Sequence, residues 1–306
     1  MTKLLELYLP LVGLSLLGFI LGGKLPKVFP AYLGKFLFWI GVPISIVAFL
    51  RKADLSGPIW IAPMVAWAAI LLGAGLAWAW IKMSPVSTPS WSQPAQGSFL
   101  LLAMVGNTGY LGYPVTLAMV GTQYFGWALF YDLLGTTLGA YGLGVVLAAR
   151  FGRGVQSHWQ LAQAILINPA LWSFGFGLGL RKLALPTVAE QVLHGLAWTA
   201  VALSLVLIGM RLSQLNSWHN LPRAAISLGI KMLLVPLILG SSLSLFGLSG
   251  SPQLVIVLQM AMPPAFATLV LAEVYNLERD LTVTALAVGY AVFLLTLPIW
   301  LWLFGN

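Results

Sequence analysis

Apolar residues fill this chain in long blocks that short polar connections separate. A helix needs about 20 apolar residues to cross a hydrocarbon core of roughly 30 Å. Runs such as AAILLGAGLAWAW do not alternate with a period of two, as the strands of a membrane barrel would. The pattern therefore predicts an all-α integral membrane protein with ten transmembrane helices, over residues 4–22, 31–50, 58–81, 99–119, 124–149, 164–181, 187–210, 221–247, 252–274 and 281–303.

Helix-breaking residues interrupt the fourth and the ninth of these blocks. The stretch GNTGYLGYP covers residues 106–114, and the stretch QMAMPPAFATL holds Pro263 and Pro264. Asn107 and Pro263 lie 156 residues apart, close to half of the 306-residue chain, so we expect two repeats of five helices. Because five is odd, the second repeat must insert inverted. Broken helices at matching positions of inverted repeats indicate a transporter with a binding site at the membrane midplane. The predicted repeats are residues 1–150 and 151–306.

The break at residues 106–114 frees backbone groups that a continuous helix would use. Pro114 lacks an N–H, and the glycines before it tolerate non-helical backbone angles. Freed N–H groups at the start of a half-helix attract anions, and freed carbonyls attract cations. The side chain of Asn107 can donate two hydrogen bonds and accept others, which suits a carboxylate or a bound ion. Alternatively, the glycines serve close helix packing and the prolines only kink the helices.

The composition supports a membrane protein and excludes other classes. Of the 306 residues, 60% are hydrophobic and 7% charged, whereas a soluble domain carries roughly 25% charged residues. The net charge of +8 comes from residues that form no cluster, so no nucleic-acid partner is expected. Cysteine is absent, and of the histidines only His194 lies within a predicted span. We therefore predict no metal site and no cofactor, and the chain offers no arrangement typical of an enzyme.

The connecting segments carry unequal numbers of basic residues on the two sides of the predicted membrane. One side collects Lys24, Lys27, Lys82, Arg150, Arg153, Arg211, Arg223 and Arg279. The other side collects Lys3, Arg51, Lys52, Arg181 and Lys182. Basic residues concentrate on the cytoplasmic side, so both termini are predicted to lie outside.

Four stretches carry a resemblance to a known family. They are WIGVPISIVAF, NTGYLGYP, NPALWSFGFGLGLRKLALPTVAEQVLHGL and LQMAMPPAFATLVLAEVYNLERDLTVTALAVGYAVFLLTLPIW. The chain resembles bacterial-type members of the auxin efflux carrier family over nearly its whole length. The resemblance implies the ten-helix fold of the bile acid:sodium symporters, in which broken helices 4 and 9 cross. Spans 1–2 and 6–7 would form a scaffold, and spans 3–5 and 8–10 a mobile transport domain.

The resemblance also implies a mechanism and partners. It predicts a secondary transporter that moves a small organic anion, such as a carboxylate, through the lipid bilayer by an elevator-type alternating-access mechanism. It suggests a homodimer formed through spans 2 and 7, located in the plasma (inner) membrane. Two alternatives stay open: a sodium-coupled symporter of the bile-acid type, and a channel, since broken helices also line pores.

The predicted site residues follow from the breaks and from the resemblance. The expected substrate-binding residues are Asn107, Thr108, Gly109, Tyr110, Pro114, Pro43, Gln259, Met262, Pro263 and Pro264. Asp132 and Lys231 fall within spans and are candidates for ion coupling, because a charge at membrane depth needs a partner. The plant carriers have a proline before the span 4 asparagine and a polar residue after the span 9 proline, where this chain has Gly106 and Pro264. These differences argue against auxin as the substrate.

Overall fold

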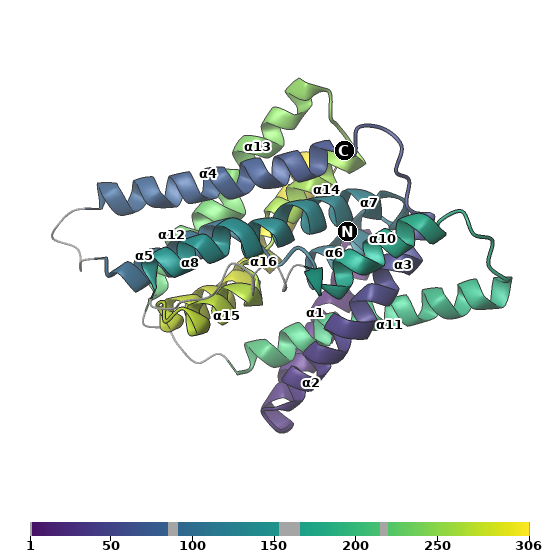
Figure 1. Cartoon of the computed structure of the whole chain (residues 1–306), viewed down its shortest axis with the longest axis horizontal. Helices are drawn as coiled ribbons and strands as arrows, with labels where there is room; N and C mark the ends of the chain where they lie inside the picture. Colours follow the sequence, from purple (N-terminus) through teal and green to yellow (C-terminus); the bar gives the residue numbers. More distant parts are fainter. Residues whose placement is uncertain (1, 85–90, 153–165, 215–219, 306) are drawn as a thin grey trace. The chain divides into compact units, whose positions relative to one another are not determined.

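The computed structural model describes residues 2–84, 91–152, 166–214 and 220–305, and within them it contains helices and no β-strand (Figure 1). The predicted all-α class is therefore confirmed for the described part of the chain. The first residues of the predicted span 164–181 and the short connection before it lie outside the described residues.

Six described helices are long and apolar enough to cross a membrane. They are Phe29–Lys52, Ile61–Met83 (α4), Thr122–Phe151, Thr187–Leu212 (α11), Leu221–Phe246 and Arg279–Phe304 (α16). The other four predicted spans are represented by α1 (Thr2–Lys24) and by the shorter segments α5 (Gln93–Met104), α6 (Gly112–Met119), α10 (Pro169–Leu180), α14 (Ser251–Met260) and α15 (Phe266–Val274). Most predicted helix ends agree with these bounds to within three residues, but α5 begins six residues before the predicted start of its span.

Several long helices contain a turn of π-helix, which the hydrophobic pattern does not reveal. Phe29–Lys52 consists of α2 (Phe29–Phe36), η1 (Leu37–Gly41) and α3 (Val42–Lys52). Thr122–Phe151 begins with a 3-10 turn, η2 (Thr122–Tyr124). It continues through α7 (Phe125–Tyr131), the π-turns η3 (Asp132–Thr137) and η4 (Ala140–Gly144), and α8 (Val145–Phe151). Leu221–Phe246 consists of α12 (Leu221–Gly229), the π-turn η5 (Ile230–Leu234), α13 (Val235–Leu243) and a final 3-10 turn, η6 (Ser244–Phe246). π-turns inside α-helices often mark functional positions.

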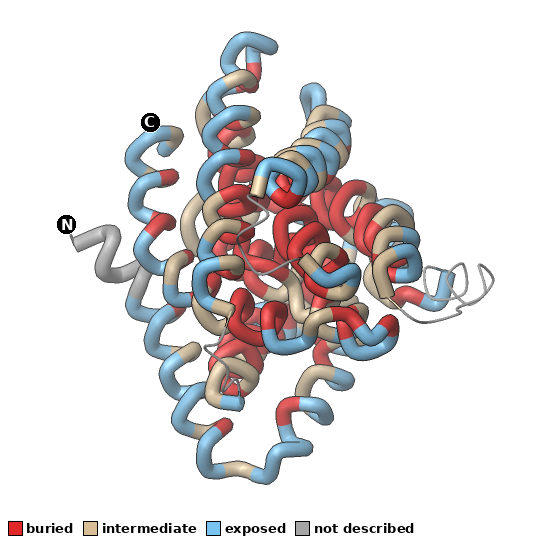
Figure 2. The backbone as a smooth tube through the Cα atoms, turned by 90° about the vertical axis from the view of Figure 1, so that its left-hand side faces the viewer, coloured by how far each residue is buried: buried red, intermediate tan, exposed pale blue. Residues whose placement is uncertain are grey.

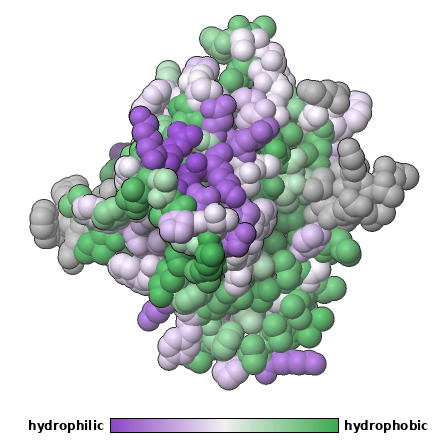
Figure 3. All heavy atoms as spheres, turned by 90° about the vertical axis from the view of Figure 1, so that its right-hand side faces the viewer, coloured by the Kyte–Doolittle hydropathy of each residue, from purple (hydrophilic) through white to green (hydrophobic). Residues whose placement is uncertain are grey.

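Large apolar side chains lie on the outside of the helices. Buried and exposed stretches alternate along several helices in Figure 2, and Figure 3 shows hydrophobic side chains over much of the visible surface. Examples are Trp39, Met64, Trp172, Phe176, Val188 and Trp302, each more than half exposed. Such a surface is costly in water and favourable against lipid tails. The arrangement fits a multi-pass integral membrane protein.

The helices fall into two compact units. Unit 1 holds Met1–Ile59, Gly109–Leu129 and Ile165–Leu215, and unit 2 holds Trp60–Thr108, Phe130–Ala164 and Asn216–Asn306. This division groups helices by mutual contact and not by repeat. The proposed repeats at 1–150 and 151–306 therefore stay a prediction.

In unit 1, α1 and α11 approach so closely that glycine is required between them. A Cβ on Gly18 would meet the backbone of Val206, and a Cβ on Gly209 would meet the carbonyl of Ser15. Small residues at a helix interface let backbones pack closely in membranes. This α1–α11 seam thus consists of continuous helices held by backbone proximity.

The end of α3 is tied to the connection between α10 and α11. The guanidinium of Arg51 donates to the carbonyls of Leu180 (2.6 Å) and Leu183 (2.7 Å) and pairs with Glu190 (3.0 Å). Arg51 therefore holds together one end of unit 1.

Just beyond Arg51, the backbone N–H of Ser56 donates to the carboxylate of Asp54. This hydrogen bond holds the pKa of that carboxyl below its usual value.

In unit 2, α4 packs along α5 and η3. A Cβ on Gly73 would meet the carbonyl of Ala103, and the indole of Trp67 donates to the carbonyl of Leu134 (3.0 Å). Leu134 lies in η3, where the wider turn changes the usual carbonyl pairing. The packing fixes α5 and η3 against a common support, and both lead to the polar residues of the candidate site.

Candidate functional site

The fourth predicted span is broken, as expected, but over a slightly different stretch. α5 ends at Met104, Val105 is extended, and α6 begins at Gly112. The unwound backbone is therefore residues 105–111, and the expectation of a break through residue 114 was wrong at its far end. Pro114 sits in the first turn of α6, where a missing N–H costs nothing because no carbonyl precedes it in the helix.

The ninth predicted span is broken where the two prolines predict it. α14 ends at Met260 and α15 begins at Phe266, so residues 261–265 are not helical. Pro263 and Pro264 cannot donate the backbone hydrogen bonds that would continue α14. The predicted break at 261–265 is confirmed.

The two breaks pair with each other inside unit 2. The N–H of Asn107 donates to the carbonyl of Pro263 (2.7 Å), and the N–H of Ala265 donates to the carbonyl of Val105 (3.1 Å). Gly106 and Pro264 face each other between these bonds in an antiparallel bridge. In this pattern the central pair exchanges no hydrogen bonds, so a proline is tolerated there. We call residues 105–108 together with 260–265 the crossover.

Asn107 is buried in the crossover, and its amide donates to the hydroxyl of Tyr290 in α16. The ring of Tyr290 stacks on Phe266, the first residue of α15, with centroids 5.9 Å apart. A Cβ on the neighbouring Gly289 would lie 3.2 Å from Pro263. Tyr290 is not among the site residues predicted from the sequence. The signal was a glycine followed by a tyrosine inside an otherwise apolar span.

Thr108 and Asp132 form a second polar contact at the crossover. The hydroxyl of Thr108 donates to the carboxylate of Asp132, which is 8% exposed and begins the π-turn η3. A hydrogen bond from a hydroxyl stabilises the ionised carboxylate in a region with little water. The charged residue of the fifth span is thus held at the crossover.

Lys231 forms the third contact. It lies in the π-turn η5, is 3% exposed, and donates from Nζ to the carbonyl of Met260 (2.6 Å). Met260 is the last residue of α14, so its carbonyl has no partner further along that helix. Gln259 and Met262, on either side, are fully buried. The ammonium group therefore caps the C-terminal end of a broken helix.

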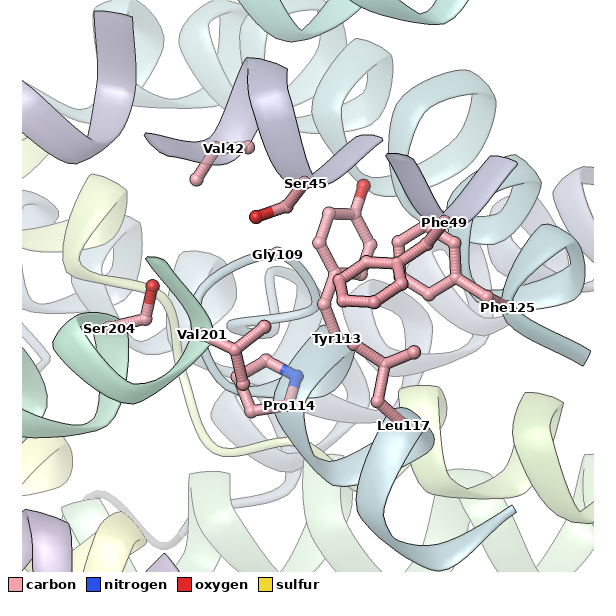
Figure 4. Close-up of a pocket in the computed structure, with 10 residues that line it drawn as sticks. All are labelled: Val42, Ser45, Phe49, Gly109, Tyr113, Pro114, Leu117, Phe125, Val201 and Ser204. Carbon is pink, nitrogen blue, oxygen red and sulfur yellow. The ribbon is translucent and has the colours of Figure 1, made fainter. Parts of the chain in front are cut away.

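The remaining predicted residues lie in unit 1. Gly109 and Pro114 line a small pocket in that unit (Figure 4). The other lining residues are Val42, Ser45, Phe49, Tyr113, Leu117, Phe125, Val201 and Ser204. Tyr110 packs instead against the cluster of Leu37, Ala200 and Leu207. Pro43 is adjacent in sequence to the lining residue Val42 but is not itself part of the lining.

The unit 1 pocket is mainly apolar. The rings of Phe49, Tyr113 and Phe125 gather along one side of it in Figure 4, with centroids 5.1 to 5.4 Å apart. The hydroxyl of Ser45 donates to the carbonyls of Gly41 and Ala197, and the hydroxyl of Ser204 donates to the carbonyl of Ala200. The lining carries no charged side chain, so the pocket suits an apolar group and not an anion.

The crossover has the chemistry of a site for a charged solute. It brings together an amide, a carboxylate, an ammonium group and the uncapped start of α15, whose N-cap residue Ala265 offers no side-chain acceptor. Among the described residues, no group of three His, Asp or Glu side chains could hold a metal ion. Unwound backbone at membrane depth occurs where helices line a path for substrates or ions.

An apolar helical fold with two paired helix breaks is typical of a membrane transport protein. The profile of the family described as membrane transport protein matches residues 155–301. An uncharacterized transporter of Methanothermobacter thermautotrophicus is 30% identical over 301 residues, covering 96% of each chain. An uncharacterized transporter of Methanocaldococcus jannaschii is 28% identical over 217 residues, covering 69% of each chain. The chain belongs to this family of membrane transport proteins, which is the auxin efflux carrier type, as its motifs predicted.

Proposed function

We propose that the protein is a secondary transporter that moves a small organic anion, a carboxylate, by an elevator-type alternating-access mechanism. The observation that carries the proposal is the pairing of the two helix breaks through Asn107 and Pro263, next to buried polar side chains. A midplane site built from broken helices is typical of secondary transporters. Transport itself follows from the family, and the substrate class follows from the chemistry of the crossover.

Three features of the crossover favour an anion. The first turn of α15 presents N–H groups at the positive end of a helix dipole. Asn107 has a second amide hydrogen besides the one that reaches Tyr290. Lys231 adds a positive charge within the same set of paired segments. A carboxylate can accept from several of these donors at once.

The composition of the compact units supports the division into scaffold and transport domain. Unit 2 contains most of the residues of spans 3–5 and 8–10. Unit 1 contains spans 1, 2, 6 and 7 together with Gly109–Leu129, which is the second half of span 4 and the start of span 5. We propose that the former move while the latter stay anchored, through a homodimer contact of spans 2 and 7. The two helix breaks lie about half a chain apart and pair with each other, residues 105–107 facing residues 263–265, and this arrangement supports the inverted repeat. We further propose the plasma membrane as the location, with both termini outside.

The test is a binding screen followed by one substitution. Purified protein is screened by thermal shift against monocarboxylates, dicarboxylates, indole acids and bile acids, and an acid that binds is then used in proteoliposome uptake. Asn107→Ala should weaken binding of that acid about 10- to 100-fold, because the substrate loses a buried donor. Asn107→Asp should be worse, since it sets a negative charge against the anion.

The matched control is another buried amide. Gln253 is buried in α14 and donates to the carbonyl of Gly240 (2.9 Å) and the hydroxyl of Ser244 (3.0 Å), so its role is structural. Gln253→Ala should lower the melting temperature and leave acid binding unchanged. If Asn107→Ala binds and transports the acid as wild type does, the site lies elsewhere. Flux that fails to saturate with substrate would indicate a channel.

A further inference from the structure

We propose that Lys231 is a built-in cation, which occupies the place where a metal cation would otherwise bind at the crossover. The protein would then need no sodium or potassium ion to complete the site. This inference rests on the proposed function as a carrier, and it deepens that function by naming how the site treats the coupling cation.

The ammonium group of Lys231 lies at the C-terminal end of a broken helix. A half-helix that ends at membrane depth leaves carbonyls with partial negative charge, and such carbonyls coordinate cations in transporters. α14 ends in this way at Met260, and Nζ of Lys231 lies 2.6 Å from its carbonyl oxygen. The primary amine therefore makes the contact that a bound cation would make.

The buried charges of unit 2 balance each other. Asp132 and Lys231 are the two residues with charged side chains that are buried in the described part of the chain. Asp132 is held by Thr108, and Lys231 approaches Gly106, two residues earlier in the same unwound segment. The negative charge at the crossover thus already has a positive counterpart that belongs to the protein, and a metal ion would leave an uncompensated charge.

The space around the ammonium group of Lys231 is closely bounded by the backbone of the crossover. A Cβ on Gly106 would lie 3.1 Å from Nζ and 3.2 Å from Cε of Lys231, closer than ordinary contact. Glycine at 106 therefore leaves room for the lysine head. Because Lys231 is 3% exposed, its ammonium group does not reach water at the membrane surface, so the position is specific and not a case of snorkelling.

The experiment measures the response of the folded protein to cations and uses no substrate. Wild type and Lys231→Ala are purified in detergent, and their melting temperatures are compared in sodium, potassium and choline chloride at equal ionic strength. Wild type should melt at the same temperature in all three salts. Lys231→Ala should melt lower in choline and be raised by roughly 5 °C or more in sodium or potassium, in a saturable manner, because the ion enters the opened space and is coordinated by the Met260 carbonyl.

Two variants make the comparison specific. Lys231→Met removes the charge but fills the space, so it should be destabilised and stay insensitive to the salt. Lys35→Ala removes an exposed lysine of α2 in unit 1 and should respond as wild type does. Lys231→Ser opens the same space as Lys231→Ala and serves as its duplicate.

Two results would overturn the inference. The first is stabilisation of wild type by sodium or potassium relative to choline. The second is a Lys231→Ala and a Lys231→Ser protein that ignore both ions, or that stay unfolded in all three salts, since an occupied cation site should rescue them. Neither result depends on the acid screen, so a failure of the proposed substrate class and a failure of this inference are separable.

Discussion

The α1–α11 seam of unit 1 and the crossover of unit 2 use the same residue types for different purposes. At the seam, Gly18 and Gly209 let two unbroken helices touch backbone to backbone. At the crossover, Gly106 lies where the helix has ended, and the space it leaves is filled by a lysine side chain. The seam therefore gains stability from packing alone. The crossover gives up helical hydrogen bonds and keeps buried polar groups, which is the pattern of a functional site.

The largest effect should come from the buried charges of the crossover. Lys231→Met removes the buried ammonium group that contacts the crossover, so Asp132 loses its positive counterpart, and a stranded buried charge costs about 3–5 kcal/mol. Asp132→Asn should be costly for the same reason, and the double variant should be more stable than at least one single variant. Denaturation in detergent measures the cycle. Additive effects would mean that the two charges do not interact, and the crossover would then resemble the seam.

The next effect should come from the seam. Gly209→Ala forces a Cβ against the carbonyl of Ser15 in α1, and overpacking of this kind costs about 1–3 kcal/mol. The matched control is Gly195→Ala in the same helix, where a Cβ would meet no atom within 4 Å. Melting temperatures of the two variants give the measurement. Equal melting temperatures would show that the seam tolerates a methyl group and is looser than the glycine contacts indicate.

A smaller effect should separate two ion pairs. Arg51→Ala removes a clamp whose side chain is 8% exposed and holds two carbonyls, so we expect a loss of about 2 kcal/mol. Arg279→Ala removes an exposed pair with Glu273 and should cost less than about 1 kcal/mol. Chemical denaturation of both variants makes the comparison. If the Arg279 variant loses as much stability as the Arg51 variant, burial does not set the strength of these pairs.

The hydrophobic pattern predicted the helices because lipid imposes the same length on every span. The two breaks were also readable, the one at 261–265 as predicted and the one at 105–111 with its far end placed three residues too late, since glycine and proline at membrane depth have few other uses. The pairing of Asn107 with Tyr290 was not, because it joins residues 183 positions apart and depends on how α16 packs. The π-turns that carry Asp132 and Lys231 were equally invisible, because no side-chain pattern specifies one extra residue in a turn.

The acceptor of Lys231 could not be predicted for a further reason. It is the backbone carbonyl of Met260, and every residue in the chain has such a carbonyl. What distinguishes this one is that α14 ends there, which is a property of the fold and not of the methionine. The sequence can therefore suggest that a buried lysine needs a partner, but the end of a helix supplies it.

The bridge between Gly106 and Pro264 also bears on how such a protein can diverge. Both positions sit between the two backbone hydrogen bonds, so neither needs its own N–H for the pairing. A larger residue at 106 would, however, press on the head of Lys231. Substitutions at 106 and 231 are thus expected to be epistatic: a bulkier residue at the first position should be tolerated better beside a shorter one at the second.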